Sequence, residues 1–127
     1  MDVKVVDASA LAAVIFKEPE REEMARRLEG SRLIAPALLG FEILNVCLIK
    51  LRRHPEMRAS LLQGFVLQGG LTIESAEIDH VSALVLAKRF RLTGYDATYL
   101  WLAQRLNAEL VTLDRQLARA ATLLRAG

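Results

Sequence analysis

The chain has 127 residues and a mass of 14.1 kDa, which is the size of one domain. Its hydrophobic content of 53% and mean hydropathy of +0.25 exclude a disordered protein, because disordered chains combine low hydrophobicity with high net charge. The single Cys47 excludes an internal disulfide and is typical of a reducing compartment. No Cys/His cluster has the spacing of a zinc site, and the net charge of +2 is too small for a polybasic protein.

The first third of the sequence alternates short apolar runs with amphipathic segments, which is the pattern of strands separated by helices. We expect strands at residues 3–6 and 33–35. Between them we expect a short helix at residues 9–16 and a second helix that begins near Pro19 and ends before Gly30, since proline suits a first helical position and glycine a helix end.

A long helix should begin at Pro36 and reach about Arg53. The most apolar stretch of the chain, residues 33–49, overlaps most of this helix and has 17 residues, whereas a membrane-spanning helix needs about 20. We therefore predict a helix buried in a protein core and no membrane partner. Asp2 and Asp7 also interrupt the N-terminal pattern of a signal peptide, so we expect a cytoplasmic protein.

The second half continues the alternation. We expect a helix from Pro55 to the Gly69-Gly70 pair, helices at 78–89 and 94–107, a final helix from about Arg115, and strands at 71–74 and 110–112. Strands separated by helices of this length need crossover connections. The sequence therefore predicts the α/β class, with one domain over residues 1–127 and a central, mostly parallel sheet flanked by helices.

Four carboxylates fall where the strands of such a sheet end. Asp7 directly follows the first strand, and Asp114 lies two residues beyond Thr112 at the end of the fourth. Asp96 lies in the first turn of the penultimate helix, and Glu42 about two turns into the helix that leaves the second strand. Ligands of parallel sheets collect outside the carboxyl ends of the strands, so we expect the four side chains to converge there.

Each carboxylate also has a purely structural interpretation. Asp7 and Asp114 can cap the helices that follow them, and Asp96 fits a capping box with the threonine three residues earlier. Glu42 is harder to explain in this way, because it and Asn45 are the only polar side chains of residues 36–49 and an unpaired buried carboxylate is costly.

If the four carboxylates converge on one site, they can bind a common ligand. Crowded carboxylates raise one another's pKa, and a divalent cation removes this repulsion. Mg²⁺ or Mn²⁺ suits oxygen ligands and needs no His or Cys. An ion of this kind lowers the pKa of a bound water and stabilises an in-line phosphoryl displacement, so the pattern indicates phosphodiester hydrolysis.

The stretches that hold these carboxylates resemble the four motifs of the PIN domain family, and most closely the VapC toxins of toxin–antitoxin pairs. The third stretch is the most specific of the four. They are VVDASALAAVIF (5–16), APALLGFEILNV (35–46), LTGYDATYLWLA (92–103) and LVTLDRQLARAA (110–121).

The resemblance implies a PIN-like fold with a four- or five-stranded sheet and a metal-dependent endoribonuclease that cuts RNA with a metal-activated water. It also implies a VapC-like toxin that is held inactive by a cognate VapB-like antitoxin and forms a homodimer. The implied catalytic residues, which are also the ligands of one or two Mg²⁺ or Mn²⁺ ions, are Asp7, Glu42, Asp96 and Asp114, with Ser9, Asn45 and Thr112 as supporting residues.

A different class of function remains open: a non-catalytic acidic pocket that captures a partner peptide. Metal dependence would distinguish it from a nuclease. We assign His54 and His80 to the surface, because they stand among charged or turn residues and neither follows a strand. We assign Cys47 to the core, because it lies within an apolar helix, where a free cysteine behaves as a small hydrophobic residue. For an antitoxin, apolar residues on the first two helices hint at a docking surface, namely Leu11, Val14, Ile15 and Met24.

Overall fold

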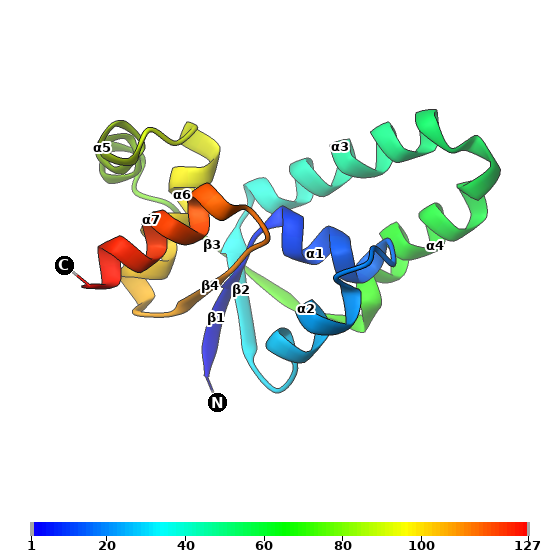
Figure 1. The fold of residues 1–127 in the computed structure, drawn as a ribbon, viewed down its shortest axis with the longest axis horizontal. Helices are drawn as coiled ribbons and strands as arrows, with labels where there is room; N and C mark the ends of the chain where they lie inside the picture. The colour runs from blue at the N-terminus through cyan, green and yellow to red at the C-terminus, as the bar shows by residue number, and fades with distance from the viewer. Residues whose placement is uncertain (1, 127) are drawn as a thin grey trace.

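The computed structural model describes residues 2–126, and they form an α/β domain (Figure 1). In chain order its elements are β1 (Val3–Val6), α1 (Ala8–Ile15), α2 (Arg21–Leu28), β2 (Arg32–Pro36), α3 (Leu38–Arg53), η1 (Pro55–Met57), α4 (Arg58–Leu67), η2 (Gln68–Gly70), β3 (Ile73–Ala76), α5 (His80–Phe90), α6 (Gly94–Leu106), β4 (Glu109–Val111) and α7 (Arg115–Ala126).

Within the described residues the strands form one four-stranded sheet in the order β3-β2-β1-β4, and every pair is parallel. The chain runs outward from β1 to β3 and then returns to the other side of β1 to form β4. The strand order therefore reverses between β1 and β4, and ligands of open parallel sheets bind outside the carboxyl ends of the strands at such a point. The predicted fold class is confirmed.

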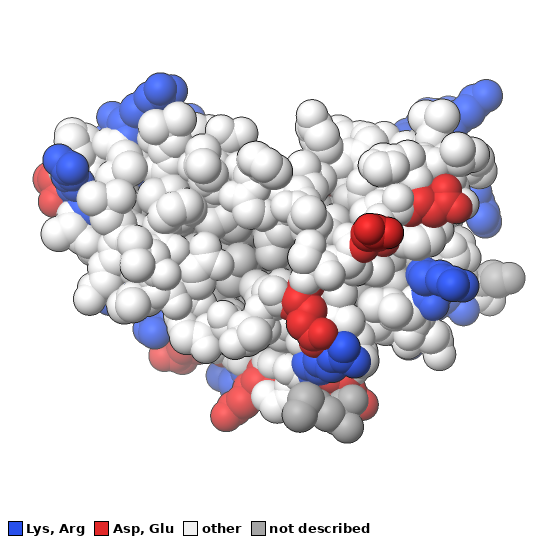
Figure 2. Space-filling model, turned by 180° about the vertical axis from the view of Figure 1, so that it is seen from behind, with Lys and Arg blue, Asp and Glu red and all other residues white. Residues whose placement is uncertain are grey.

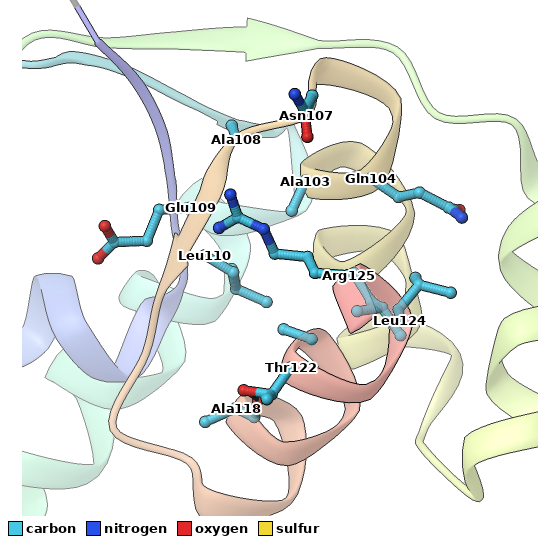
Figure 3. A pocket seen from close by; sticks show the side chains of 12 residues that line it. Ala103, Gln104, Asn107, Ala108, Glu109, Leu110, Ala118, Thr122, Leu124 and Arg125 are labelled. Atoms are coloured by element: carbon cyan, nitrogen blue, oxygen red, sulfur yellow. Dashed lines mark hydrogen bonds between the residues drawn. The ribbon is translucent and has the colours of Figure 1, made fainter. Parts of the chain in front are cut away.

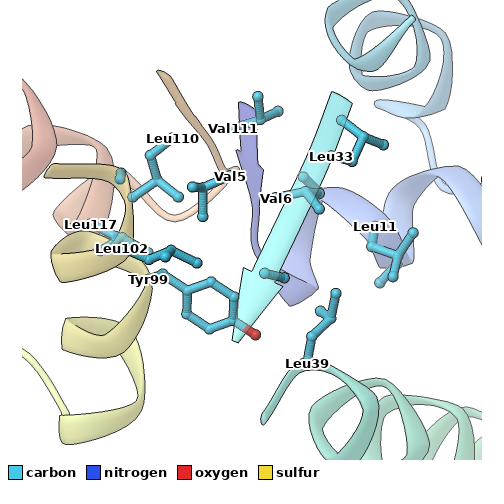
Figure 4. Packing of buried hydrophobic residues seen from close by; sticks show 14 of the residues in the cluster. Val5, Val6, Leu11, Leu33, Leu39, Tyr99, Leu102, Leu110, Val111 and Leu117 are labelled. Atoms are coloured by element: carbon cyan, nitrogen blue, oxygen red, sulfur yellow. The ribbon is translucent and has the colours of Figure 1, made fainter. Parts of the chain in front are cut away.

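Helices cover both faces of the sheet. Figure 1 shows α5, α6 and α7 on one side and α1 to α4 on the other, with the hairpin of α3 and α4 extending away from the strands. Val5 and Val6 of β1, one of the two inner strands, have no exposed surface, because helices pack on both sides of the sheet. Figure 4 shows residues of this core, including Tyr99 and Leu102 from α6 and Leu11 from α1.

The prediction of a buried helix after β2 was wrong for most of α3. Leu39, Ile43 and Cys47 are buried, but Phe41 is 71% exposed and Leu44 is 49% exposed. The reason is the hairpin geometry: one face of α3 packs on the domain and the other has no cover among residues 2–126. Figure 2, seen from the opposite side to Figure 1, shows a face with few charges in its middle and a hollow between two lobes.

The hint of a docking surface on the first two helices was also wrong. Leu11, Val14, Ile15 and Met24 are all buried, because α1 packs between the sheet and the neighbouring helices. Most of the large apolar side chains that are exposed belong instead to α3, α4 and α5, for example Val66 on α4 and Leu84 on α5.

Element boundaries moved by a few residues. Pro36 ends β2, where it pairs with Ala76 of β3, and does not begin α3. No helix in the described part of the chain is long and apolar enough to cross a membrane. His54 and His80 are exposed and Cys47 is buried, as predicted.

Candidate active site

Asp7 lies at the carboxyl end of β1, next to the point where the strand order reverses. Only 5% of the residue is exposed. Its Oδ1 accepts hydrogen bonds from the backbone N–H of Ala10, 3.1 Å away, and from the hydroxyl of Ser9, 2.8 Å away. Its Oδ2 accepts from the hydroxyl of Thr112 at 2.5 Å. Both carboxylate oxygens are therefore held by neighbouring groups.

The same hydroxyls connect the ends of β1 and β4. Ser9 Oγ accepts from the backbone N–H of Leu113 at 2.9 Å, and Thr112 Oγ1 accepts from that of Asp114 at 3.0 Å. The two hydroxyl oxygens lie 3.3 Å apart. Ser9 and Thr112 thus link Asp7 to the segment that carries Asp114.

Asp114 caps α7, since its Oδ1 accepts from the backbone N–H of Leu117 at 3.0 Å. Asp7 caps α1 in the same manner, so the structural interpretation of both residues is correct. A capping role does not exclude a role in a binding site, because the cap uses Oδ1 of Asp114 and the residue is exposed.

Asp96 lies in the first turn of α6. Its backbone N–H donates to Thr93 Oγ1 at 3.0 Å, which is half of a capping box. Within residues 2–126 no return hydrogen bond joins the Asp96 carboxylate to the backbone of Thr93. The helix cap therefore does not account for this side chain.

Glu42 is half-buried on α3 and is bound by a residue that the sequence did not single out. The hydroxyl of Tyr99 donates to Glu42 Oε1 at 2.6 Å. The sequence signal that could have identified Tyr99 is its position three residues after Asp96, which places both residues on one face of α6. Asn45, the supporting residue expected for Glu42, is exposed and has no hydrogen bond to it in the described part of the chain.

The carboxylates influence one another electrostatically. Burial raises the pKa of Asp7, and the charge of Asp114 adds to this increase, while hydrogen bonds from Thr112, Ala10 and Ser9 oppose it. Burial likewise raises the pKa of Glu42 and of Asp96. Nearby acids contribute to both: Asp96 and Asp7 for Glu42, and Asp114 and Asp7 for Asp96.

No Lys or Arg of the described part of the chain forms an ion pair with this cluster. Among residues 2–126, the ion pairs join Arg27 with Glu109, Arg32 with Glu74, Lys50 with Glu18 and His54 with Glu56, and none includes the four carboxylates. Within the described residues the four acids therefore form an anionic cluster without a basic partner, and a divalent cation is stabilised in such an environment.

The donor set fits a hard cation in its chemistry. It consists of carboxylate and hydroxyl oxygens, the ligands that Mg²⁺ and Mn²⁺ prefer. As the side chains are placed, however, no three Asp, Glu, His or Cys residues in the described range lie close enough together to hold a metal ion. The arrangement resembles the open sites in which Mg²⁺ is held by one or two carboxylates, substrate phosphate and several waters.

A separate cavity of about 310 Å³ lies between α6, β4 and α7 (Figure 3). Glu109, Leu110 and Arg125 line it, so it opens near the beginning of β4 and not at its carboxyl end. None of the four clustered acids lines this cavity. The candidate site is accordingly the acidic edge, where the polar groups converge.

A model of the PIN domain family matches residues 4–123. The chain belongs to the PIN domain family. The resemblance expected from the four motifs is confirmed, because the match covers nearly the whole length of the chain in one alignment.

Two relatives from Pyrobaculum aerophilum are similar to this PIN domain protein. Ribonuclease VapC3 is 35% identical over 120 residues, which covers 90% of this chain and 91% of the relative. The crystal structure of PAE2754 has a TM-score of 0.65 at 22% identity, and the match covers 98% of this chain and 95% of that chain. At 22% identity, the similarity to PAE2754 is evidence for the fold alone.

Proposed function

We propose that this PIN domain protein is an Mg²⁺- or Mn²⁺-dependent endoribonuclease that acts as the toxin of a toxin–antitoxin pair in the cytoplasm. The observation that carries the proposal is the cluster of Asp7, Glu42, Asp96 and Asp114, which has no basic partner within residues 2–126. The similarity to a relative named Ribonuclease VapC3 supports RNA as the substrate.

The four acids would hold one or two divalent ions. Such an ion would lower the pKa of water for attack on a phosphodiester and stabilise charge on the phosphate oxygens. Asp7 and Glu42 would present carboxylates whose orientation is set by hydroxyl donors, while Asp96 and Asp114 stand at the first turns of α6 and α7.

Helix ends also stabilise the carboxylates themselves. Asp7, Asp96 and Asp114 lie at the amino ends of α1, α6 and α7, and the partial positive charge of a helix amino end stabilises a carboxylate. Ser9 and Thr112 would keep the Asp7 carboxylate ionised and in place by donating to it.

Cleavage of transfer RNA and ribosomal RNA by the purified chain in Mg²⁺ or Mn²⁺ tests the proposal. We expect discrete fragments that disappear with EDTA and in Asp96→Asn, with a rate at least about 100-fold lower in the variant. Asn45→Ala is the matched control, because within residues 2–126 this exposed amide has no hydrogen bond to the four acids. Equal cleavage by wild type and Asp96→Asn would contradict the assignment.

Calorimetry separates the nuclease from a non-catalytic acidic pocket. A protein that binds Mn²⁺ and cuts RNA supports the proposal. A protein that binds no divalent ion, cuts no RNA and captures an arginine-rich peptide would be a binding module instead.

We further propose that the chain forms a homodimer and binds a VapB-like antitoxin. The supporting observation is the set of exposed apolar residues on α5, Val81, Leu84 and Val85, which are 73%, 68% and 61% exposed. Exposed apolar patches on soluble proteins commonly mark protein contacts. Light scattering should give the mass of a dimer, and Leu84→Lys should shift it toward the monomer; a wild-type mass of one chain would contradict the homodimer.

A further inference from the structure

Tyr99 connects two helices beneath the acidic cluster. The residue lies on α6, is 1% exposed, and belongs to the hydrophobic core. Figure 4 shows its ring extending from α6 past the end of β2 in the direction of Leu39 on α3. Its hydroxyl reaches α3, where it donates to Glu42 Oε1 at 2.6 Å.

Core packing by itself does not call for this hydroxyl. A phenylalanine would bury the same ring without a polar atom, whereas a buried tyrosine needs a partner for its O–H. Here that partner is one of four clustered acids, and a core hydroxyl could be satisfied by any backbone carbonyl. The pairing of a core hydroxyl with a site carboxylate points to a role for Tyr99 in the site.

The bond also relates two of the carboxylates to each other. Asp96 and Tyr99 are three residues apart on one face of α6, and Glu42 lies on α3. The ring of Tyr99 is rigid and fixed by packing, so the hydroxyl sets where Glu42 lies relative to the helix that carries Asp96. Oε1 is occupied by this bond, and Oε2 accepts no protein hydrogen bond in the described residues.

We propose that Tyr99 is a positioning residue, which holds Glu42 by Oε1 and leaves Oε2 to bind a divalent ion. The inference rests on the proposed metal-dependent function and adds the residue that prepares one ligand before the ion arrives. Groups that orient metal ligands in this way typically contribute about 10- to 100-fold to metal affinity.

The test compares the two tyrosines of the chain. Tyr99→Phe removes the hydroxyl that binds Glu42, and Tyr95→Phe removes one from a 64% exposed residue on the same helix. Mn²⁺ affinity is measured by calorimetry for both variants, with urea unfolding in EDTA to follow the fold. We expect Tyr99→Phe to bind Mn²⁺ about 10- to 100-fold more weakly and Tyr95→Phe to bind like wild type.

The same substitution in a Glu42→Gln protein shows whether Tyr99 changes Mn²⁺ affinity through Glu42. In Glu42→Gln the amide oxygen can still accept the Tyr99 hydroxyl, but the ligand charge is gone. Adding Tyr99→Phe to this variant should change Mn²⁺ affinity less than about 3-fold, because the orienting bond no longer serves a carboxylate ligand. An equally large loss in both backgrounds would overturn the positioning role.

The Tyr95→Phe protein offers a measurement that leaves Tyr99 intact, since Tyr99 is then the single tyrosine. Binding of Mn²⁺ to Glu42 should weaken the hydrogen bond that this carboxylate accepts and so change the tyrosine absorption band. Glu42→Gln should abolish the change. An unchanged band at saturating Mn²⁺ would overturn the inference even if Tyr99→Phe does not fold.

The result separates two kinds of failure. Wild-type protein that binds no Mn²⁺ and cuts no RNA would overturn the proposed function and the role of Tyr99 with it. Wild-type protein that binds Mn²⁺ and cuts RNA, with Tyr99→Phe matching it in affinity, would overturn the role of Tyr99 alone.

Discussion

The four carboxylates of the candidate site are held in two different ways, which separate an inner pair, Asp7 and Glu42, from an outer pair, Asp96 and Asp114. Asp7 and Glu42 accept hydroxyl bonds from residues far away in the chain, Thr112 at 105 positions and Tyr99 at 57. Asp96 and Asp114 lie at helix beginnings, where bonds between residues three apart hold the chain. The inner pair is therefore positioned by contacts with distant residues, to which Asp7 adds a local cap of α1, and the outer pair is positioned by local helix geometry.

This difference predicts separate consequences for stability and for chemistry. An inner carboxylate takes part in the packing of the domain, so its removal should disturb both. The Asp96 carboxylate caps no helix in the described residues, so its removal should affect ion binding and cleavage without lowering stability, whereas removal of Asp114 also removes the cap of α7.

The largest effect is expected for Asp7→Ala. Cleavage should fall at least about 100-fold, and the free energy of unfolding in EDTA should fall by about 1–3 kcal/mol, because α1 loses its cap and the buried Thr112 hydroxyl loses its acceptor. Urea unfolding and RNA cleavage check both parts. Asp96→Asn should lose cleavage with stability at or above wild type; an equal loss of stability in the two variants would remove the distinction between inner and outer carboxylates.

Divalent ions should stabilise the folded protein. Mn²⁺ at about 100 times its dissociation constant should raise the free energy of unfolding by about 2.7 kcal/mol, since only the folded chain brings the four acids together. Thermal unfolding with and without Mn²⁺ measures the gain. Asp96→Asn should show less than half of it, and a full gain in that variant would exclude Asp96 as a ligand.

A smaller effect concerns pH. Burial and the charges of Asp114 and Asp7 raise the pKa of Asp96 in the folded protein. The folded protein therefore binds a proton at Asp96 more readily than the unfolded chain does, so ionisation of this acid lowers the free energy of unfolding as pH rises. Without metal, Asp96→Asn should therefore exceed wild type at pH 7 by less than about 1 kcal/mol, because the group is partly exposed.

The advantage of Asp96→Asn should disappear below the ordinary Asp pKa of about 3.9, where the carboxyl is protonated in both states. Chemical unfolding at pH 7 and pH 3 in EDTA measures the difference. An advantage that persists at pH 3 would show that repulsion between the carboxylates is not its source.

The smallest effect is expected for Asn45→Ala. This side chain is exposed on α3 and Tyr99 is the group bound to Glu42, so stability should change by less than about 0.5 kcal/mol and cleavage should not change. A loss of cleavage comparable to that of Asp96→Asn would return Asn45 to the site as a supporting residue.

Local signals were enough to predict most of the fold. The valine-rich run of residues 3–6 forms β1, and Thr93 begins α6 by accepting the N–H of Asp96, because strand propensity and helix caps depend on residues close in sequence. The placement of Asp7 and Asp114 at one edge also followed from the sequence, since parallel strands end on the same side of a sheet.

The exposure of α3 could not be predicted in this way. Its run of apolar residues fits a buried helix equally well, and only the hairpin with α4 shows that one face, including Phe41, leaves the core. Periodicity states which residues share a face of a helix, but what covers that face depends on elements distant in the chain.

By itself, the sequence determined the order of strands and helices and the four acids at the strand ends, because these depend on neighbouring residues and on the direction of parallel strands. The tertiary structure decided which groups hold those acids. Thr112 reaches Asp7 and Tyr99 reaches Glu42 only after the helices have packed on the sheet, and hydrogen bonds between distant residues have no signature in local sequence.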